Sequence, residues 1–195
     1  MRESADKRSR RTQRIIQTTM LELLCTQPMT SIKIVDLCTQ ADINRTTFYL
    51  HFSSIADVLA SLQDEIIRHI FAESEALVDF TKPSDPLPFL NACTGVLGSY
   101  KHLGNFLRHG QDADLFLNGL KSRVTETLLS RYIKKGGSAV LGSHSLLLFL
   151  TAGVLDVYIA WLKTDQSVPF AVVIGYCAPV VEKGLQLLAS NIRRP

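Results

Sequence analysis

The stretch INRTTFYLHF, residues 43 to 52, concentrates polar and aromatic side chains that could form hydrogen bonds with a nucleic acid. A guanidinium such as that of Arg45 can donate two hydrogen bonds to guanine, and a threonine offers a hydroxyl and a methyl group. Tyr49 and His51 can reach phosphate oxygens. These side chains suit recognition of the major groove of double-stranded DNA. The candidate contacts are Asn44, Arg45, Thr46, Thr47, Tyr49, Leu50 and His51.

Two short helices would have to position these side chains. A helix-turn-helix needs a small residue, a residue tolerant of positive φ four positions later, a hydrophobe directly after it and a large hydrophobe ten positions after the first. This spacing is met by Cys38, Asp42, Ile43 and Phe48. We expect helices over 34–41 and 45–52, with Asn44 capping the second. The alternative is a short helix whose polar face is merely solvated.

Helical periodicity continues along the rest of the chain. An amphipathic helix is expected over 11–27, and Ser53 and Ser54 should cap a long fourth helix that reaches about residue 78. The prolines of TKPSDPLP, residues 81–88, then break the chain. Further helices are expected over 88–101, 103–109, 112–134, 143–163 and 168–191. No strand pattern is present, so we predict an all-α fold of about nine helices.

Positive charge is concentrated near the N-terminus. The chain has 195 residues and a formal net charge of +3, and its excess of Lys and Arg lies within residues 1–52. These basic residues could attract phosphate, although a solvated tail that aids solubility is the alternative. They are Arg2, Lys7, Arg8, Arg10, Arg11 and Arg14. Four widely spaced cysteines and no secretion signal favour a reduced, cytoplasmic location.

The segment IKIVDLCTQADINRTTFYLHFSSIADVL resembles the N-terminal domain of TetR-family transcriptional regulators over about residues 10–60. The form INRTTFYLHF is similar to a branch common in Firmicutes. Weaker resemblance is carried by FLRHGQDADLFLNGLKSRV and GVLDVYIAWL. Asp42 stands where the family usually has glycine. Ile55 stands where it usually has a phosphate-contacting lysine, so Lys33 or the basic N-terminal residues would have to replace that contact.

The resemblance implies an architecture and a function. A three-helix helix-turn-helix DNA-binding head would occupy residues 1–54, a connecting helix residues 55–80, and a helical dimerisation and effector-binding body residues 81–195. The implied protein is a homodimeric DNA-binding transcriptional regulator, expected to act as a repressor and to respond to a small, largely apolar ligand. The alternative is a coactivator-dependent regulator or adaptor whose helical body binds a partner protein.

The last two expected helices are predicted to join two subunits. Both are too apolar to face water, and Gly153, Gly175 and Gly184 would permit close approach of their backbones. Two helices from each partner would form a four-helix interface. The DNA operator should then be a pseudo-palindrome.

The body also contains candidate lining residues for a ligand pocket. Aromatic rings with a few polar tips suit an apolar cavity for a small, uncharged effector. An ordinary packed core is the alternative. The candidate lining residues are Phe89, Cys93, Leu97, Tyr100, Phe116, Leu120, Val124 and Tyr158.

Other chemistry finds little support in the sequence. No nucleophile-elbow, dinucleotide-binding, phosphate-loop or zinc-protease motif is present, so we expect neither an enzyme nor a cofactor. His102, His109 and Cys93 could build a metal site but contain no close ligand pair, so none is expected. Residues 146–162 are almost entirely apolar, but Asp156 interrupts them, which favours a buried helix over a membrane span. Asp156 should pair across a subunit interface or contact a ligand.

Overall fold

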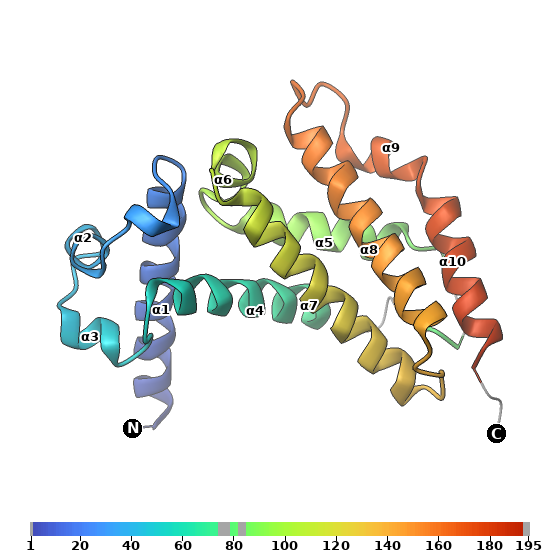
Figure 1. The fold of residues 1–195 in the computed structure, drawn as a ribbon, viewed down its shortest axis with the longest axis horizontal. Helices are drawn as coiled ribbons and strands as arrows, with labels where there is room; N and C mark the ends of the chain where they lie inside the picture. Colours follow the sequence, from blue (N-terminus) through green and yellow to red (C-terminus); the bar gives the residue numbers. More distant parts are fainter. Residues whose placement is uncertain (1, 74–78, 82–84, 193–195) are drawn as a thin grey trace. The chain divides into compact units, whose positions relative to one another are not determined.

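The computed structural model describes residues 2–73, 79–81 and 85–192. These residues form ten α-helices and one short 3-10 helix and contain no strand, which confirms the predicted all-α fold (Figure 1). The chain divides into two compact units. Unit 1 comprises Met1–Glu65 and Gly98–Phe116, and unit 2 comprises Ile66–Leu97 and Leu117–Pro195.

Unit 1 is built on a long first helix. Its elements are α1 (Arg2–Leu24), a 3-10 helix η1 (Met29–Ser31), α2 (Ile34–Gln40), α3 (Arg45–Tyr49), the first part of α4 (Ile55–Glu73), α6 (Leu103–His109) and the start of α7 (Ala113–Lys134). Ile16 and Met20 of α1, Leu37 of α2 and Phe48 of α3 are completely buried. Burial of these side chains holds the short helices α2 and α3 in place, because helices of seven and five residues are not stable alone.

The start of α4 is capped as predicted. The Ser54 hydroxyl accepts a hydrogen bond of 3.1 Å from the backbone N–H of Asp57. The Asp57 carboxylate in turn accepts one of 2.8 Å from the backbone N–H of Ser53. This reciprocal arrangement satisfies backbone groups that the helix itself leaves unpaired.

Unit 2 contains the remainder of α4, most of α5 (Leu87–Ser99), most of α7, and α8 (Leu141–Leu162), α9 (Phe170–Gly175) and α10 (Ala178–Ser190). Both α9 and α10 pack on α8 (Figure 1). Phe80, Tyr132, Leu147 and Leu188 form a buried cluster, in which the Tyr132 hydroxyl donates to the Leu188 carbonyl oxygen at 3.1 Å.

The glycines of KKGGS end α7 rather than forming a phosphate-binding loop. Gly136 has φ of 89°, and its N–H donates to the Ile133 carbonyl. The N–H of Gly137 donates to the Tyr132 carbonyl at 3.0 Å. This hydrogen-bond pattern is a Schellman cap, which requires the left-handed conformation that glycine adopts without steric cost.

Several helix boundaries differ from those predicted, and the third helix ends at Tyr49 instead of residue 52. The single helix expected over 168–191 is broken into α9 and α10, because Pro179 lacks an N–H and its ring would clash with the carbonyl of Gly175 in a continuous helix. The first helix begins at Arg2 instead of residue 11. The fourth helix is seen over Ile55–Glu73, and its expected extension to residue 78 lies outside the described residues.

The compact units also differ from the expected head of 1–54 and body of 81–195. Gly98–Phe116, assigned to the body from the sequence, belongs to unit 1. This segment packs on α1 through α6 and is joined to unit 1 by two hydrogen bonds: the backbone N–H of Met29 donates to the Asp112 carboxylate at 2.6 Å, and the Gln63 side chain donates to the Phe116 carbonyl at 2.8 Å.

Candidate nucleic-acid interface and ligand cavity

The turn between α2 and α3 has the conformation that the sequence predicts. Asp42 has φ of 53°, in the left-handed region that Asp tolerates better than most residues. The N–H of Ile43 donates to the Cys38 carbonyl at 3.0 Å, and the N–H of Asp42 donates to the Thr39 carbonyl at 3.3 Å. These bonds close the end of α2 and set the direction of α3.

Phe48 and Phe52 anchor the third helix, and its polar residues face away from the core. Both phenylalanine side chains are buried, with their ring centroids 6.0 Å apart. Leu50, at the C-terminal end of α3, is 76% exposed. Of the predicted contact residues, Lys33, Asn44, Arg45, Thr46, Tyr49 and Leu50 are exposed, and Thr47 and His51 are half-buried.

Asn44 has a structural role within this segment. Its side-chain oxygen accepts a hydrogen bond of 2.7 Å from the backbone N–H of Thr47, as the sequence predicts for a helix cap. The amide nitrogen of Asn44 remains as a donor group on an exposed side chain. Asn44 therefore caps α3, and its amide N–H groups can donate hydrogen bonds to a nucleic acid.

The basic N-terminal residues lie on a helix and not on an irregular arm. Lys7, Arg8, Arg10 and Arg11 have exposed side chains on α1, while nothing is described of the Arg2 side chain. A surface groove of about 490 Å³ is lined by α1 residues that include Lys7, Arg10 and Arg11. Helical spacing places these charges at fixed intervals along one surface, which suits a polyanion better than a disordered tail does.

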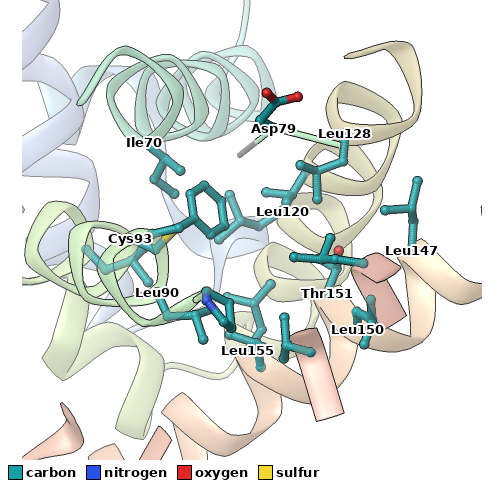
Figure 2. A pocket seen from close by; sticks show the side chains of 17 residues that line it. Ile70, Asp79, Leu90, Cys93, Leu120, Leu128, Leu147, Leu150, Thr151 and Leu155 are labelled. Carbon is teal, nitrogen blue, oxygen red and sulfur yellow. The ribbon is translucent and has the colours of Figure 1, made fainter. Parts of the chain in front are cut away.

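Unit 2 contains a partly open cavity lined by residues of α4, α5, α7, α8 and α10 (Figure 2). Its free volume is about 100 Å³. Most of its described lining is aliphatic or aromatic, and the lining contains no Lys, Arg or His. Its polar members are Asp79, Cys93 and Thr151.

The cavity contains five of the eight predicted lining residues. These are Phe89, Cys93, Leu97, Leu120 and Val124. Tyr100 and Phe116 do not line it, because both belong to unit 1, where the Phe116 ring packs edge-on against Phe106 at 5.5 Å. Tyr158 does not line it either, because its ring packs against Trp161 and Phe170 at 5.9 and 5.2 Å.

Several lining residues from α4, α8 and α10 were not predicted from the sequence. Leu147, Leu150 and Leu155 of α8 line the cavity, as do Ile70 of α4 and Leu185 of α10. One available signal was a polar residue inside an apolar run, because Thr151 lies at the centre of the long, largely apolar helix α8.

The polar groups of the lining have different environments. Burial raises the pKa of the Cys93 thiol to about 12, so the thiol is neutral. Asp79 is exposed and its carboxylate accepts hydrogen bonds from the N–H and the hydroxyl of Thr81; Figure 2 shows it at the edge of the cavity. Thr151 is 7% exposed, and its hydroxyl has no hydrogen-bond partner among the residues that the structure describes.

Asp156 pairs within its own chain, and it does not line the cavity. Its carboxylate accepts a hydrogen bond from the Lys121 ammonium of α7. This pairing differs from the expected contact with a partner subunit or ligand. Elsewhere, the described residues contain no group of three or more His, Cys, Asp or Glu side chains placed to hold a metal ion.

The outward faces of α8 and α10 carry several exposed apolar side chains. Phe149 is 65% exposed, Tyr176 between α9 and α10 is 84% exposed, and Val180 and Leu187 of α10 are about half exposed. A Cβ built at Gly153 would meet no atom within 4 Å, whereas one at Gly184 would lie 2.7 Å from Leu150. Gly184 therefore serves packing inside the chain, and Gly153 leaves the outer face of α8 open.

By length and composition alone, α8 could also cross a membrane. It has 22 residues, and its most apolar window has a mean hydropathy of 1.9 with 39% of the window buried. A single helix of this kind is weak evidence for a membrane span, because a core helix of a globular protein can have the same composition.

No protein-family model and no curated protein matches this chain.

Proposed function

We propose that this protein is a sequence-specific DNA-binding transcriptional regulator that acts as a homodimer in the cytoplasm and responds to a small, uncharged ligand. The observation that carries the proposal is the geometry of α2 and α3. The left-handed turn at Asp42 and the buried Phe48 fix a helix whose Arg45, Thr46 and Tyr49 side chains are exposed together. Those side-chain types match the donors and acceptors of base edges and phosphates.

The charges of α1 support the same proposal. Arg8 and Arg11 are exposed on a helix that belongs to the same compact unit as α3. Phosphate contacts provide most of the affinity of a DNA-binding protein, and base contacts provide its specificity. Unit 1 contains side chains suited to both kinds of contact.

The decisive experiment selects bound sequences from a random pool of double-stranded DNA with the full-length protein. A sequence-specific dimer should enrich a pseudo-palindrome whose half-sites lie about one helical turn or somewhat more apart. Binding without enrichment of any sequence would show that the protein binds DNA non-specifically. Absence of binding at low salt would refute the DNA proposal.

The proposed homodimer rests on the apolar outer surface of α8 and α10. Several large apolar side chains exposed on neighbouring helices are typical of a protein–protein interface. A second copy is favoured over a membrane, because the same two helices carry the exposed Asp156 and Lys183, which lipid would have to cover. If the protein instead sediments as a monomer, this surface is better assigned to a different partner protein, as in an adaptor.

The helix α4 supports coupling between a ligand and DNA affinity. It contributes residues to both compact units: the buried Gln63 side chain bonds the Phe116 carbonyl in unit 1, and Ile70 lines the cavity in unit 2. A ligand would change DNA affinity only to the extent that it binds differently to the DNA-bound and free conformations. Adding a cavity ligand should therefore shift the operator-binding curve.

A further inference from the structure

Thr151 differs from three other helical threonines of this protein. Thr39, Thr125 and Thr127 each donate their hydroxyl to the backbone carbonyl four residues earlier, at 2.9, 2.8 and 2.8 Å. Such a bond is the usual way for a threonine inside a helix to satisfy its hydroxyl. The Thr151 hydroxyl is buried without any partner in the described part of the chain.

Thr151 is one of the residues that line the cavity. Figure 2 shows the Thr151 side chain among those that surround it, together with Leu150 and Leu155 from the same helix. Burying a hydroxyl without a hydrogen bond is unfavourable, so a partner brought by a ligand would restore what the fold leaves unsatisfied. The hydroxyl can donate or accept, but it carries no charge.

The size and charge of the cavity limit the ligand further. A free volume of about 100 Å³ is on the scale of one ring, since an apolar cavity of about 150 Å³ binds benzene. No cationic side chain in the described lining could neutralise a carboxylate. The one carboxylate at the edge, Asp79, is already bonded to Thr81.

We propose that the cavity of unit 2 binds an uncharged, apolar molecule of about single-ring size that carries one hydrogen-bonding group, and that the Thr151 hydroxyl recognises this group. Aliphatic side chains from α7 and α8 would cover the apolar part of the ligand. This inference deepens the proposed function, and it rests on that function only for the role of the ligand as an effector.

The test measures binding of phenol, toluene and benzoate to the full-length protein by calorimetry at neutral pH, with no DNA present. Thr151→Val keeps the shape of the side chain and removes the hydroxyl. The ratio of phenol affinity to toluene affinity should fall about tenfold in this variant, because one hydrogen bond is lost only for phenol. Benzoate should bind much more weakly than phenol to the wild-type protein.

Matched variants keep the test independent of folding defects. Thr151→Ser should keep the wild-type ratio, and Thr151→Ala should lower it as Thr151→Val does. Thr125→Val removes a buried hydroxyl that does not line the cavity and should leave the ratio unchanged. An unchanged ratio in both Thr151→Val and Thr151→Ala would overturn the proposal, as would equal binding of benzoate or no binding of phenol and toluene.

The ligand-binding test and the DNA-selection experiment can fail independently of each other. If the phenol ratio falls as expected but no DNA sequence is enriched, the ligand class stands and the regulator proposal fails. If DNA is bound specifically but phenol and toluene do not bind, the ligand class fails alone.

Discussion

The side-chain oxygen of Asn44 accepts a 2.7 Å hydrogen bond from the backbone N–H of Thr47, and this bond caps the helix that presents Arg45. Asn44→Ala should lower the free energy of unfolding by about 1 kcal/mol, because the cap is lost. Asn44→Asp retains an acceptor and should keep the stability of the wild-type protein. Urea denaturation of the three proteins measures this difference, and equal stability of the Ala variant would contradict it.

The same pair of variants separates capping from DNA contact. If the Asn44 amide donates to a phosphate, Asn44→Asp should weaken DNA binding despite its intact cap, since a carboxylate repels phosphate. Unchanged DNA affinity in Asn44→Asp would limit the role of Asn44 to capping.

The exposed arginines of α1 should make DNA binding steeply dependent on salt. Replacing Arg8 and Arg11 by Gln should reduce the slope of log affinity against log salt concentration by about 1.8 per subunit, if each neutralises one phosphate. Replacing Lys134 and Lys135 by Gln changes the net charge equally at the end of α7 and should leave the slope unchanged. Equal slopes for both double variants and the wild type would show that α1 makes no phosphate contact.

A charge introduced on the outer face of α8 should separate the subunits. Phe149 is 65% exposed, and Phe149→Glu would bury a carboxylate in the proposed interface. Leu115, 56% exposed in unit 1, gives the matched control Leu115→Glu. Analytical ultracentrifugation at micromolar concentration should find dimers of the wild type and the control and monomers of Phe149→Glu. A monomeric wild type would exclude the homodimer.

Burial should make the Cys93 thiol unreactive. Burial raises the pKa of this thiol to about 12, so very little thiolate, the form that reacts, is present at pH 8. Alkylation by iodoacetamide, followed for each cysteine-containing peptide by mass spectrometry, should be far slower for Cys93 in the folded protein than in urea. Equal rates in the two conditions would mean that the cavity is open to water.

Local chemistry explains which features the sequence could predict. The left-handed Asp42, the cap at Asn44 and the buried Phe48 all depend on residues fewer than ten positions apart, so their spacing determines the turn. The break before α10 could also have been predicted from the sequence, because Pro179 cannot continue a helix.

The cavity depends on long-range packing, and the sequence predicted it only in part. The face of a helix that lines a cavity is determined by the neighbouring helices. Because α8 is apolar nearly all round, its hydrophobic periodicity does not indicate which face that is. Leu155 lines the cavity, whereas Tyr158 packs on Trp161. The role of Thr151 could not be predicted either, since most helical threonines bond their own backbone.

The central claim, sequence-specific recognition of DNA by α3, is tested most directly by Arg45→Ala. The measurement is fluorescence anisotropy with the selected operator and with variants of it at each position. The account predicts a loss of about 1 to 3 kcal/mol on the operator, with base preference relaxed at one position in each half-site, if the guanidinium reads a guanine. Arg108→Ala removes an exposed arginine of α6 and should bind like the wild type. Unchanged operator affinity in Arg45→Ala, or an equal loss on every DNA sequence, would contradict base readout by Arg45.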